Sequence, residues 1–311
     1  MDDIGANGAT LTYIAAWDAN EYTITFVTDG TPVAAITQDY GTEITADTTT
    51  TKSGYTFAGW KNAKGNIVEV PKTMPAESIT LTATWTALDG IAYTVKTYKM
   101  NLDGTTYAET SEILYDTAGK EVTAATPDVE GFTLNEGKST LKGNVEGDGS
   151  LVLEVYYDRN KITVKVDDEE EKDYFYGYEI ATPTDPVIPE GGEFDGWKDE
   201  DGEKVDFPYT VPDEEDGKIT ITPIILYTVK FFKDAEMTEE VFTAKGETVD
   251  TYTVPSTSKA GYTFNGWTLN GADAGLTVDG EAAFPEGGAN YVASWTALDG
   301  IAYTVKTYKM N

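Results

Sequence analysis

Carboxylates are the most abundant side chains in this sequence that could do chemistry. Of its 311 residues, 54 are Asp or Glu, and none is Cys or His. This composition excludes thiol nucleophiles, imidazole bases, disulfides and the usual zinc ligands. The chemistry left to consider is a paired-carboxylate hydrolase, a calcium site, or a bond between a Lys and an Asn side chain.

Acidic clusters stand beside turn residues at 167–171, 199–201 and 213–216. The middle cluster, followed by Gly202 and Glu203, faintly resembles a calcium loop. It lacks the Asp-x-Asp-x-Asp-Gly register and the distal bidentate Glu of such loops. We therefore favour a solvated turn and expect no metal ligand. The pair Asp148-Gly149 is typical of a hairpin turn.

No pattern in the sequence predicts catalysis. A glycoside hydrolase needs one carboxylate pair held in a cleft, which small modules rarely offer. The Gly-x-Ser-x-Gly, phosphate-loop and His-Glu-x-x-His motifs are missing from the sequence. Lys96 and Lys165 lie beside expected strands, but no Lys, Asn and buried-acid set accompanies them. We expect no enzyme, no catalytic residue, no cofactor and no isopeptide bond.

The charge balance excludes the commonest macromolecular partners. Asp and Glu outnumber the 22 Lys and Arg residues, for a formal net charge of -32. Such a chain repels nucleic acid and stays soluble at a crowded surface. No apolar run approaches the ~20 residues needed to span a membrane. No leader follows Met1, so we expect any export signal to lie outside this sequence.

The strongest internal repeat is exact. The segment WTALDGIAYTVKTYKMN occupies residues 85–101 and recurs unchanged at 295–311, an offset of 210 residues. We therefore expect a parent protein that repeats a multi-module unit of this length.

A looser repeat consists of paired segments that alternate apolar and polar residues. This period-two pattern, rich in aromatic and β-branched residues, is typical of half-buried strands. Opening strands are expected at Tyr22/Ile24/Phe26, Tyr93/Val95, Ile162/Val164/Val166, Tyr227/Val229/Phe231 and Tyr303/Val305. Closing strands are expected at Leu11/Tyr13/Ala15/Trp17, Ile79/Leu81/Ala83/Trp85, Leu151/Leu153/Val155/Tyr157, Ile219/Ile221/Pro223/Ile225 and Tyr291/Ala293/Trp295.

These strands divide the chain into four modules with an incomplete strand at each end. The first to fourth modules are expected at residues 21–88, 89–160, 161–226 and 227–298, with an orphan closing strand in 1–20 and an orphan opening strand in 299–311. One to seven residues, Leu226 alone in the shortest case, separate each closing strand from the next opening strand. Because such linkers are too short to act as flexible tethers, we expect an elongated, semi-rigid rod.

Three modules share the motif Gly-x-x-Phe-x-Gly-Trp. Together with opening strands like YTITF and closing strands like TLTATW, it resembles the internalin-type B repeat, also called the Listeria-Bacteroides repeat. The resemblance covers residues 21–87, 161–226 and 227–297. The motif residues are Gly54, Phe57, Gly59 and Trp60; Gly191, Phe194, Gly196 and Trp197; and Gly261, Phe264, Gly266 and Trp267. The middle copy departs most, with Gly192-Glu193 inside the motif and no closing Trp.

The second module lacks this motif. It has GFTL at 131–134, GNVEGDG at 143–149 and LVLEVYYDRN at 151–160, and so resembles a mucin-binding-protein (MucBP) type repeat over residues 92–160. Both resemblances imply β-grasp, ubiquitin-like folds and a wall-anchored or secreted bacterial protein. We expect a mostly β, small α+β class and a location at the surface or cell wall of a Gram-positive bacterium.

The Trp motif poses a geometric problem in a strand. Phe57 and Trp60 are an odd number of residues apart, so a flat strand would point them to opposite faces. Both reach one core only if the strand bulges, and Gly59 suits a bulge because glycine accepts positive φ. We favour a core role for the Trp over the alternative, an exposed ligand-binding ring.

Three functions follow from this sequence. The favoured one is a non-catalytic stalk or spacer that projects other domains from the cell wall. An adhesive module that binds host glycan or protein through the MucBP-like repeat is the alternative, since the 20 tyrosines suit either strands or ligand contacts. A third is head-to-tail self-association, in which a terminal strand takes the place of its identical copy in another chain; terminal strands that simply fray are the competing expectation.

Overall fold

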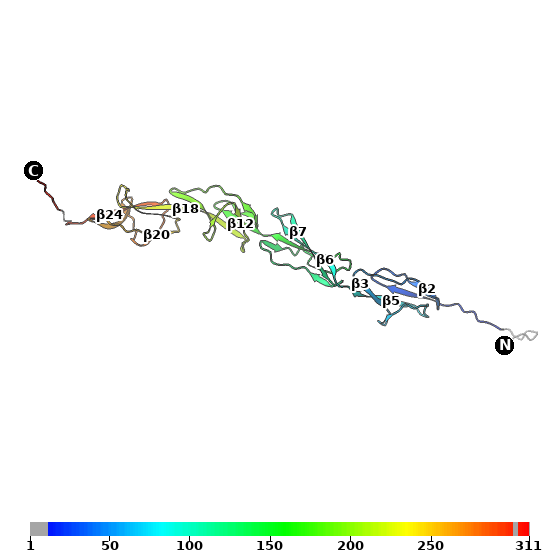
Figure 1. Cartoon of the computed structure of the whole chain (residues 1–311). Helices are drawn as coiled ribbons and strands as arrows, with labels where there is room; N and C mark the ends of the chain where they lie inside the picture. Colours follow the sequence, from blue (N-terminus) through cyan, green and yellow to red (C-terminus); the bar gives the residue numbers. More distant parts are fainter. Residues whose placement is uncertain (1–11, 301–303, 311) are drawn as a thin grey trace, which may run out of the picture. The chain divides into compact units, whose positions relative to one another are not determined.

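The computed structural model describes residues 12–300 and 304–310. They form two compact units, residues 1–158 and 159–311. The described residues contain strands and no helix (Figure 1). The mostly β class is therefore confirmed. A β-grasp domain also packs a helix on its sheet, so that finer assignment stays a prediction.

The first sheet of unit 1 follows the order β2-β1-β5-β3-β4. Its central strands β1 and β5 run parallel, and the outer strands pair antiparallel. Alternate residues of β1 and β5 (Ile24, Phe26 and Leu81) point into a core completed by Ile36, Trp60 and Met74. The strands are β1 (Glu21–Val27), β2 (Ile36–Asp39), β3 (Tyr55–Lys61), β4 (Ile67–Val68) and β5 (Ile79–Ala87).

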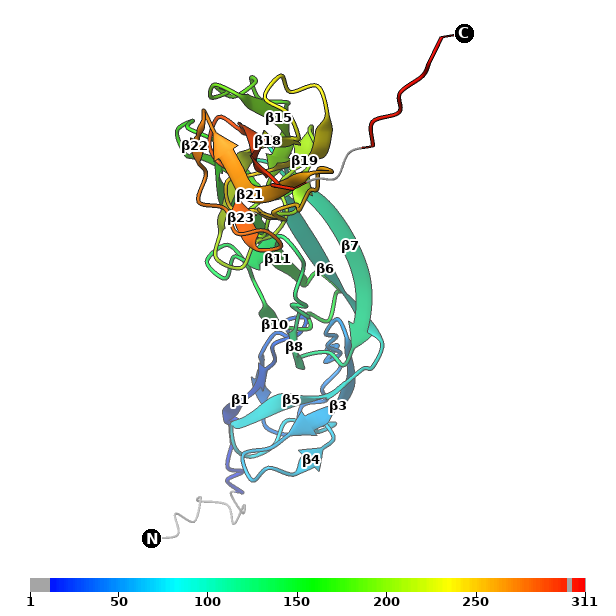
Figure 2. The same ribbon diagram turned by 90° about the vertical axis from the view of Figure 1, so that its left-hand side faces the viewer.

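The second sheet of unit 1 follows the order β7-β6-β11-β9. Its longest pairing joins β6 and β7, which run side by side over ten residues (Figure 2). The core includes Tyr93, Val145, Leu153, Val155 and Tyr157. The strands are β6 (Ile91–Met100), β7 (Tyr107–Asp116), β9 (Phe132–Leu134) and β11 (Val152–Arg159), with a separate pair β8 (Glu121–Thr123) and β10 (Lys142–Asn144).

Unit 2 is built on one nine-stranded sheet around β18. Two further strand pairs, β14–β17 and β20–β23, lie outside that sheet. The strands are β12 (Lys161–Val166), β13 (Lys172–Phe175), β14 (Glu179–Ile180), β15 (Gly192–Lys198), β16 (Lys204–Val205), β17 (Tyr209–Thr210), β18 (Lys218–Phe232), β19 (Glu240–Gly246), β20 (Thr251–Thr253), β21 (Tyr262–Leu269), β22 (Ala272–Asp273), β23 (Glu281–Ala283) and β24 (Ala289–Ala297).

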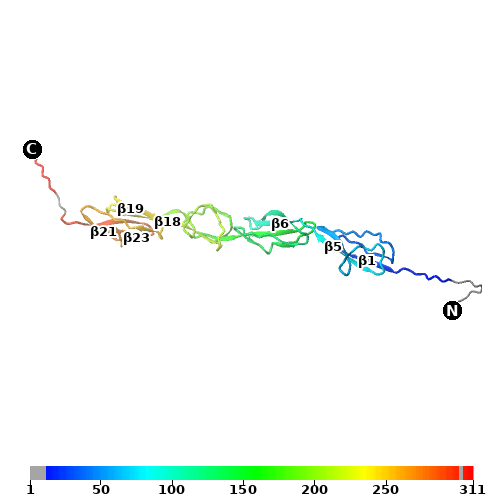
Figure 3. The same ribbon diagram turned by 60° about the horizontal axis from the view of Figure 1, so that its bottom comes forward.

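A single 15-residue strand, β18, serves two modules. Its first part closes the third module beside β12 and β15, and its last part opens the fourth beside β19 and β24. Figure 3 labels β18 and its neighbour β19 in this part of the chain. The sequence predicted Leu226 as a one-residue linker. The structure corrects this, because Leu226 pairs with Glu193 inside the uninterrupted strand.

In each module the opening and closing strands pair in parallel at the centre of the sheet. These pairs are β1 with β5, β6 with β11, β12 with β18, and β18 with β24. Parallel strands require a long crossover between them, which explains why each pair is separated by most of a module. Four separate hydrophobic clusters accompany the four pairs.

The two terminal segments form no strand where they are described. Residues 12–20 and 304–310 are exposed and irregular. The remaining residues of the expected orphan strands, including Leu11 and Tyr303, lie outside the described residues. Strand exchange between chains therefore stays a prediction.

Candidate functional site: the Trp motif and the module junctions

The three motif tryptophans lie in the cores of their modules. Trp60, Trp197 and Trp267 expose only 4%, 7% and 1% of their surface. The predicted core role is confirmed, because these three rings are buried and not exposed as a ligand-binding ring would be.

A bulge brings each Trp to the same face as its Phe, as predicted. The strand register shifts between Phe57 and Gly59, and the equivalent strands β15 and β21 shift at the same place. The bulge glycines Gly59, Gly196 and Gly266 have φ angles of 126°, 115° and 120°. The Phe and Trp rings then meet edge to face, with centroids 5.2 to 5.4 Å apart. Glycine allows this backbone at no steric cost.

The closing tryptophans make hydrogen bonds that sequence reasoning missed. The indole N–H of Trp85 donates to the Asp29 carboxylate at 2.7 Å, and Lys52 donates to the same carboxylate at 2.6 Å. The hydrogen bond from Lys52 is the main reason that the pKa of Asp29 lies below its ordinary value. In the fourth module, Trp295 donates instead to the backbone carbonyl of Lys233 at 3.0 Å.

The acidic clusters are occupied with local turns and ion pairs. Asp199 accepts backbone N–H bonds from Asp201 and Glu203. In the first cluster, Glu169 and Glu171 pair with lysines at 3.0 and 2.7 Å. Within residues 12–300 and 304–310, no group of three or more acidic side chains could hold a metal ion. The solvated-turn interpretation of residues 199–203 agrees with these contacts.

The expected hairpin turn and the two strand lysines also lie within the described residues. Asp148-Gly149 forms a turn, with Gly149 at φ 79° and the Asp148 carboxylate accepting the N–H of Ser150. Lys96 forms an ion pair with Glu109 at 2.8 Å across β6 and β7. Lys165 is half-buried on β12.

The junction inside unit 1 is made largely of backbone. Only residues 88–90 separate β5 from β6. The N–H of Leu88 donates to the carbonyl of Gly54, and the carbonyl of Leu88 accepts from Ala118 of the second module. The hydroxyl of Thr117 donates to Asp89 at 2.5 Å. Loops of both modules are thus bonded to the linker itself.

The junction inside unit 2 adds charge pairs to the shared strand β18. Lys198 of the third module pairs with Glu247 of the fourth at 2.6 Å, and both side chains are only 22% exposed. A second pair runs the other way, from Lys245 of the fourth module to Glu193 of the third. Charges of both signs on each module fix the register of the contact.

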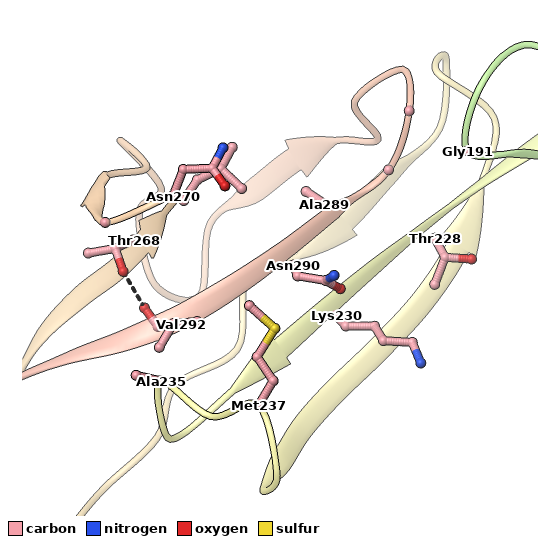
Figure 4. A pocket seen from close by; sticks show the side chains of 14 residues that line it. Gly191, Thr228, Lys230, Ala235, Met237, Thr268, Asn270, Ala289, Asn290 and Val292 are labelled. Atoms are coloured by element: carbon pink, nitrogen blue, oxygen red, sulfur yellow. Dashed lines mark hydrogen bonds between the residues drawn. The ribbon is translucent and has the colours of Figure 1, made fainter.

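A groove of about 650 Å³ lies on the sheet beside this junction (Figure 4). Its lining includes Thr228 and Lys230 of β18, Asn290 of β24, and Met237 and Gly191 from neighbouring loops. These side chains alternate with the core residues of the same strands, so the groove lies on the outer face of the sheet. Its lining offers hydroxyl, amide and ammonium groups, and none of them was predicted as a site.

The model of the Listeria-Bacteroides repeat domain matches residues 22–84, 154–220 and 227–283, which is more than half of the chain. The chain belongs to the Listeria-Bacteroides repeat family. All three matches include a bulged Phe-x-Gly-Trp segment. They leave most of the second module outside, so the MucBP resemblance of that module stays a prediction.

One curated relative is similar to part of this chain. A protein of Evansella cellulosilytica named "Putative membrane protein" is 30% identical over 145 residues, which is 44% of this chain. The chain spans about a fifth of the length of that relative, 20%. Within the described residues, the structure has no helix with the length and apolarity needed to cross a membrane.

Proposed function

We propose that this chain is a non-catalytic spacer in a cell-surface repeat protein, which holds other domains away from the cell wall of a Gram-positive bacterium. The observation that carries the proposal is the direct bonding of modules within each unit. Leu88 bonds to both modules of unit 1, and β18 runs through both modules of unit 2. Neighbours joined in this way resist bending, as a stalk requires.

Composition and kinship support the same function. Membership of a surface-type repeat family and a relative named as a membrane protein fit an extracellular location. The net charge of -32 keeps stalks apart at a crowded surface. Lys96, one of the two lysines considered for an isopeptide bond, forms an ion pair with Glu109 at 2.8 Å.

Small-angle X-ray scattering of the whole chain tests the spacer. A compact 70-residue unit is roughly 25 to 30 Å across, so four in series would span on the order of 110 Å. We expect a maximum dimension of that size. A matched control inserts a ten-residue Gly/Ser segment after Gly90, which should broaden the distance distribution. A native chain only about 45 Å across would contradict the proposal.

The second module offers a specific reason to consider adhesion as a second function. On the outer face of its sheet, Tyr98 of β6 stacks on Tyr156 of β11 with centroids 4.4 Å apart, and Tyr107 of β7 meets Tyr156 edge-on. Lys138 donates to the hydroxyl of Tyr107, which itself donates to Asp158. Aromatic faces beside hydroxyl, carboxylate and ammonium groups suit a host glycan or a protein loop.

A glycan array separates the two functions. Reproducible binding by the whole chain that is lost in Tyr156→Ala and on deletion of residues 92–160 would establish adhesion. The control is Tyr262→Ala, which removes an exposed tyrosine from the fourth module. Silence of the native chain across the array would leave the spacer as the function.

A further inference from the structure

The first glycine of the Trp motif touches the next module at both junctions that the structure describes inside its units. A Cβ on Gly54 would overlap the backbone of Gly147 in the second module. A Cβ on Gly191 would likewise overlap the backbone of Gly287 in the fourth. Both motif glycines have a φ of 75°. Two junctions thus use the same contact, glycine against a glycine turn.

In unit 1 the contact requires the absence of side chains on both partners, whereas in unit 2 a Cβ on Gly287 would meet only the carbonyl oxygen of Glu190, at an ordinary 3.7 Å. A Cβ on Gly147 would overlap the carbonyl oxygen of Ser53, the residue before the motif glycine. Gly147 lies outside the left-handed backbone region, so any residue could adopt its conformation. Its lack of a side chain therefore serves the docking of the first module and not a local turn.

The fourth module ends in the same arrangement as the first. The N–H of Leu298 donates to Gly261 at 2.8 Å, as Leu88 does to Gly54 at 2.9 Å. Gly261 has a φ of 83°. The ammonium of Lys259 lies 4.4 Å from the ring centre of Tyr262, which repeats the 4.1 Å between Lys52 and Tyr55. We call Lys259, Gly261, Tyr262, Leu298 and Asp299 the end face of the fourth module.

The two equivalent faces differ in what covers them. In unit 1 the hydroxyl of Tyr55 lies against Gly119 of the second module, and Tyr55 is half-buried. On the end face, Tyr262 is 41% exposed, whereas Leu298 at 51% is open to nearly the same extent as Leu88 at 44%. The Tyr262 ring is thus more open than its counterpart Tyr55, in the geometry that in unit 1 holds a module.

We infer that the end face of the fourth module is a docking surface for a module of the kind formed by residues 91–160. In the existing junction such a module presents two turns, one with Thr117, Ala118 and Gly119 and one with Gly147. The first turn bonds to Leu88 and Asp89. The end face has Leu298 and Asp299 at the same places, in a segment identical to residues 85–101.

This inference extends the proposed spacer function and rests on its premise that modules dock in series. The docking is specific, because the end face matches the glycine turns of the second module type. The segment WTALDGIAYTVKTYKMN would then determine that a module of the second type docks on the fourth module.

The first test extends the chain. Residues 301–311 are identical to 91–101, so adding a copy of residues 102–160 after Asn311 completes a second module of this type. Hydroxyl-radical labelling then compares Tyr262 with Tyr55 in the same molecule. In the 311-residue chain we expect Tyr262 to be labelled faster. In the extended chain its rate should fall to that of Tyr55.

Glycine variants show whether the predicted contact causes this change. Alanine at the added position that corresponds to Gly147 should restore fast labelling of Tyr262. Alanine at the added position that corresponds to Gly137 should leave Tyr262 slowly labelled, because a Cβ there meets only the Asn135 side chain at 3.5 Å. If hydrogen exchange shows that the added module is folded and the labelling rate of Tyr262 is still unchanged, the inference is overturned.

The existing junction provides a measurement that does not depend on the added module. In the native chain, Gly147→Ala should raise the labelling of Tyr55, and Gly137→Ala should leave it unchanged. Equal labelling of Tyr55 in both variants would overturn the glycine contact as the docking element. Scattering from the same samples reports the spacer separately, since a chain can be extended without this particular contact.

Discussion

The ring of Phe57 meets the ring of Trp60 edge to face, with centroids 5.4 Å apart and 66° between their planes. Trp60 also lies 4.9 Å from Phe26, so one indole joins the bulged strand β3 to the central strand β1. Removing it leaves a large cavity. We expect Trp60→Ala to lower the free energy of unfolding of the first module by about 3 to 5 kcal/mol.

Hydrogen exchange resolved by module measures this loss, and the same change at Trp197 or Trp267 should act on the third or fourth module. Trp17→Ala is the matched control, because Trp17 is 89% exposed. An unchanged first module in the Trp60 variant would mean that the ring is a surface group, and would favour a ligand role for the motif.

Gly59 and Gly266 hold equivalent bulges but have different surroundings. A Cβ on Gly59 would lie 2.7 Å from Cγ2 of Ile67, whereas a Cβ on Gly266 meets nothing within 4 Å. Both alanine variants are strained at positive φ, at about 1 to 3 kcal/mol each. We expect Gly59→Ala to cost more, and Ile67→Ala to recover the difference.

Urea unfolding of the native chain, Gly59→Ala, Ile67→Ala and the double variant measures the coupling between the two positions as a double-mutant cycle. Ile67→Ala alone should cost little, because Ile67 is 61% exposed. Equal losses for Gly59→Ala in both backgrounds would show that backbone strain accounts for the whole effect.

The bulge was predictable from sequence because Phe57 and Trp60 are an odd number of residues apart. Without a bulge their side chains would point to opposite faces of the sheet. The strands were predictable because apolar residues alternate along them. The uninterrupted course of β18 through Leu226 was not predictable. A strand that contributes to two cores changes the face that it turns inward, so the simple alternation breaks. The sequence places Pro223 and Ile225 inward, whereas the structure buries Ile224, at 7% exposure. The alternation changes phase beside Pro223.

The junction contacts were hidden from sequence for a different reason. Gly54 and Gly147 touch through their backbones, and a backbone contact leaves no side-chain pattern to recognise. The hydrogen bond between Trp85 and Asp29 joins residues 56 positions apart, so no local spacing indicates it. Core residues can be predicted from residue type. The contacts of Gly54 and Trp85 depend instead on where loops distant in the sequence come to lie.

Acid should affect the two closing tryptophans differently. The Lys52 hydrogen bond lowers the pKa of Asp29 below its value of 3.8 in an unfolded chain. A depressed folded-state pKa contributes stability that is present above the unfolded pKa and is lost as the pH falls through the folded pKa. We therefore expect the Trp85 indole N–H resonance to shift in acid, below about pH 4. Trp295 bonds to a carbonyl, which does not titrate there.

Nuclear magnetic resonance of the indole N–H groups follows both residues in one titration. In Asp29→Asn the acid shift of Trp85 should disappear while Trp295 is unaffected. A shift of the same size and midpoint at both indoles would point to general unfolding in acid and not to Asp29.

The ion pair between Lys198 and Glu247 should contribute modestly to the junction in unit 2. Both side chains are partly shielded at 22% exposure, and their atoms lie 2.6 Å apart. We expect a coupling of about 0.5 to 1 kcal/mol in a cycle of Lys198→Gln and Glu247→Gln. Salt should reduce it. A cycle on Lys204 and Asp195, which pair within the third module at higher exposure, is the control.

The shared strand β18 predicts that the third and fourth modules unfold together. Tyr227 and Ile224 are buried on the stretch between the two cores, and strands of both modules hydrogen-bond to β18. Opening either module would expose one side of that strand, so each module stabilises its neighbour. We expect amides of β12 and β24 to exchange with the same free energy of opening.

Inserting Gly-Gly-Ser between Leu226 and Tyr227 should separate the two modules, because it interrupts the ladder that they share. The fourth module should then open independently of the third in native-state hydrogen exchange. The same insertion after Gly271, in the turn between β21 and β22, is the control and should leave the coupling intact. Different opening free energies for β12 and β24 in the unmodified chain would show that a continuous strand does not suffice to couple two modules of this family.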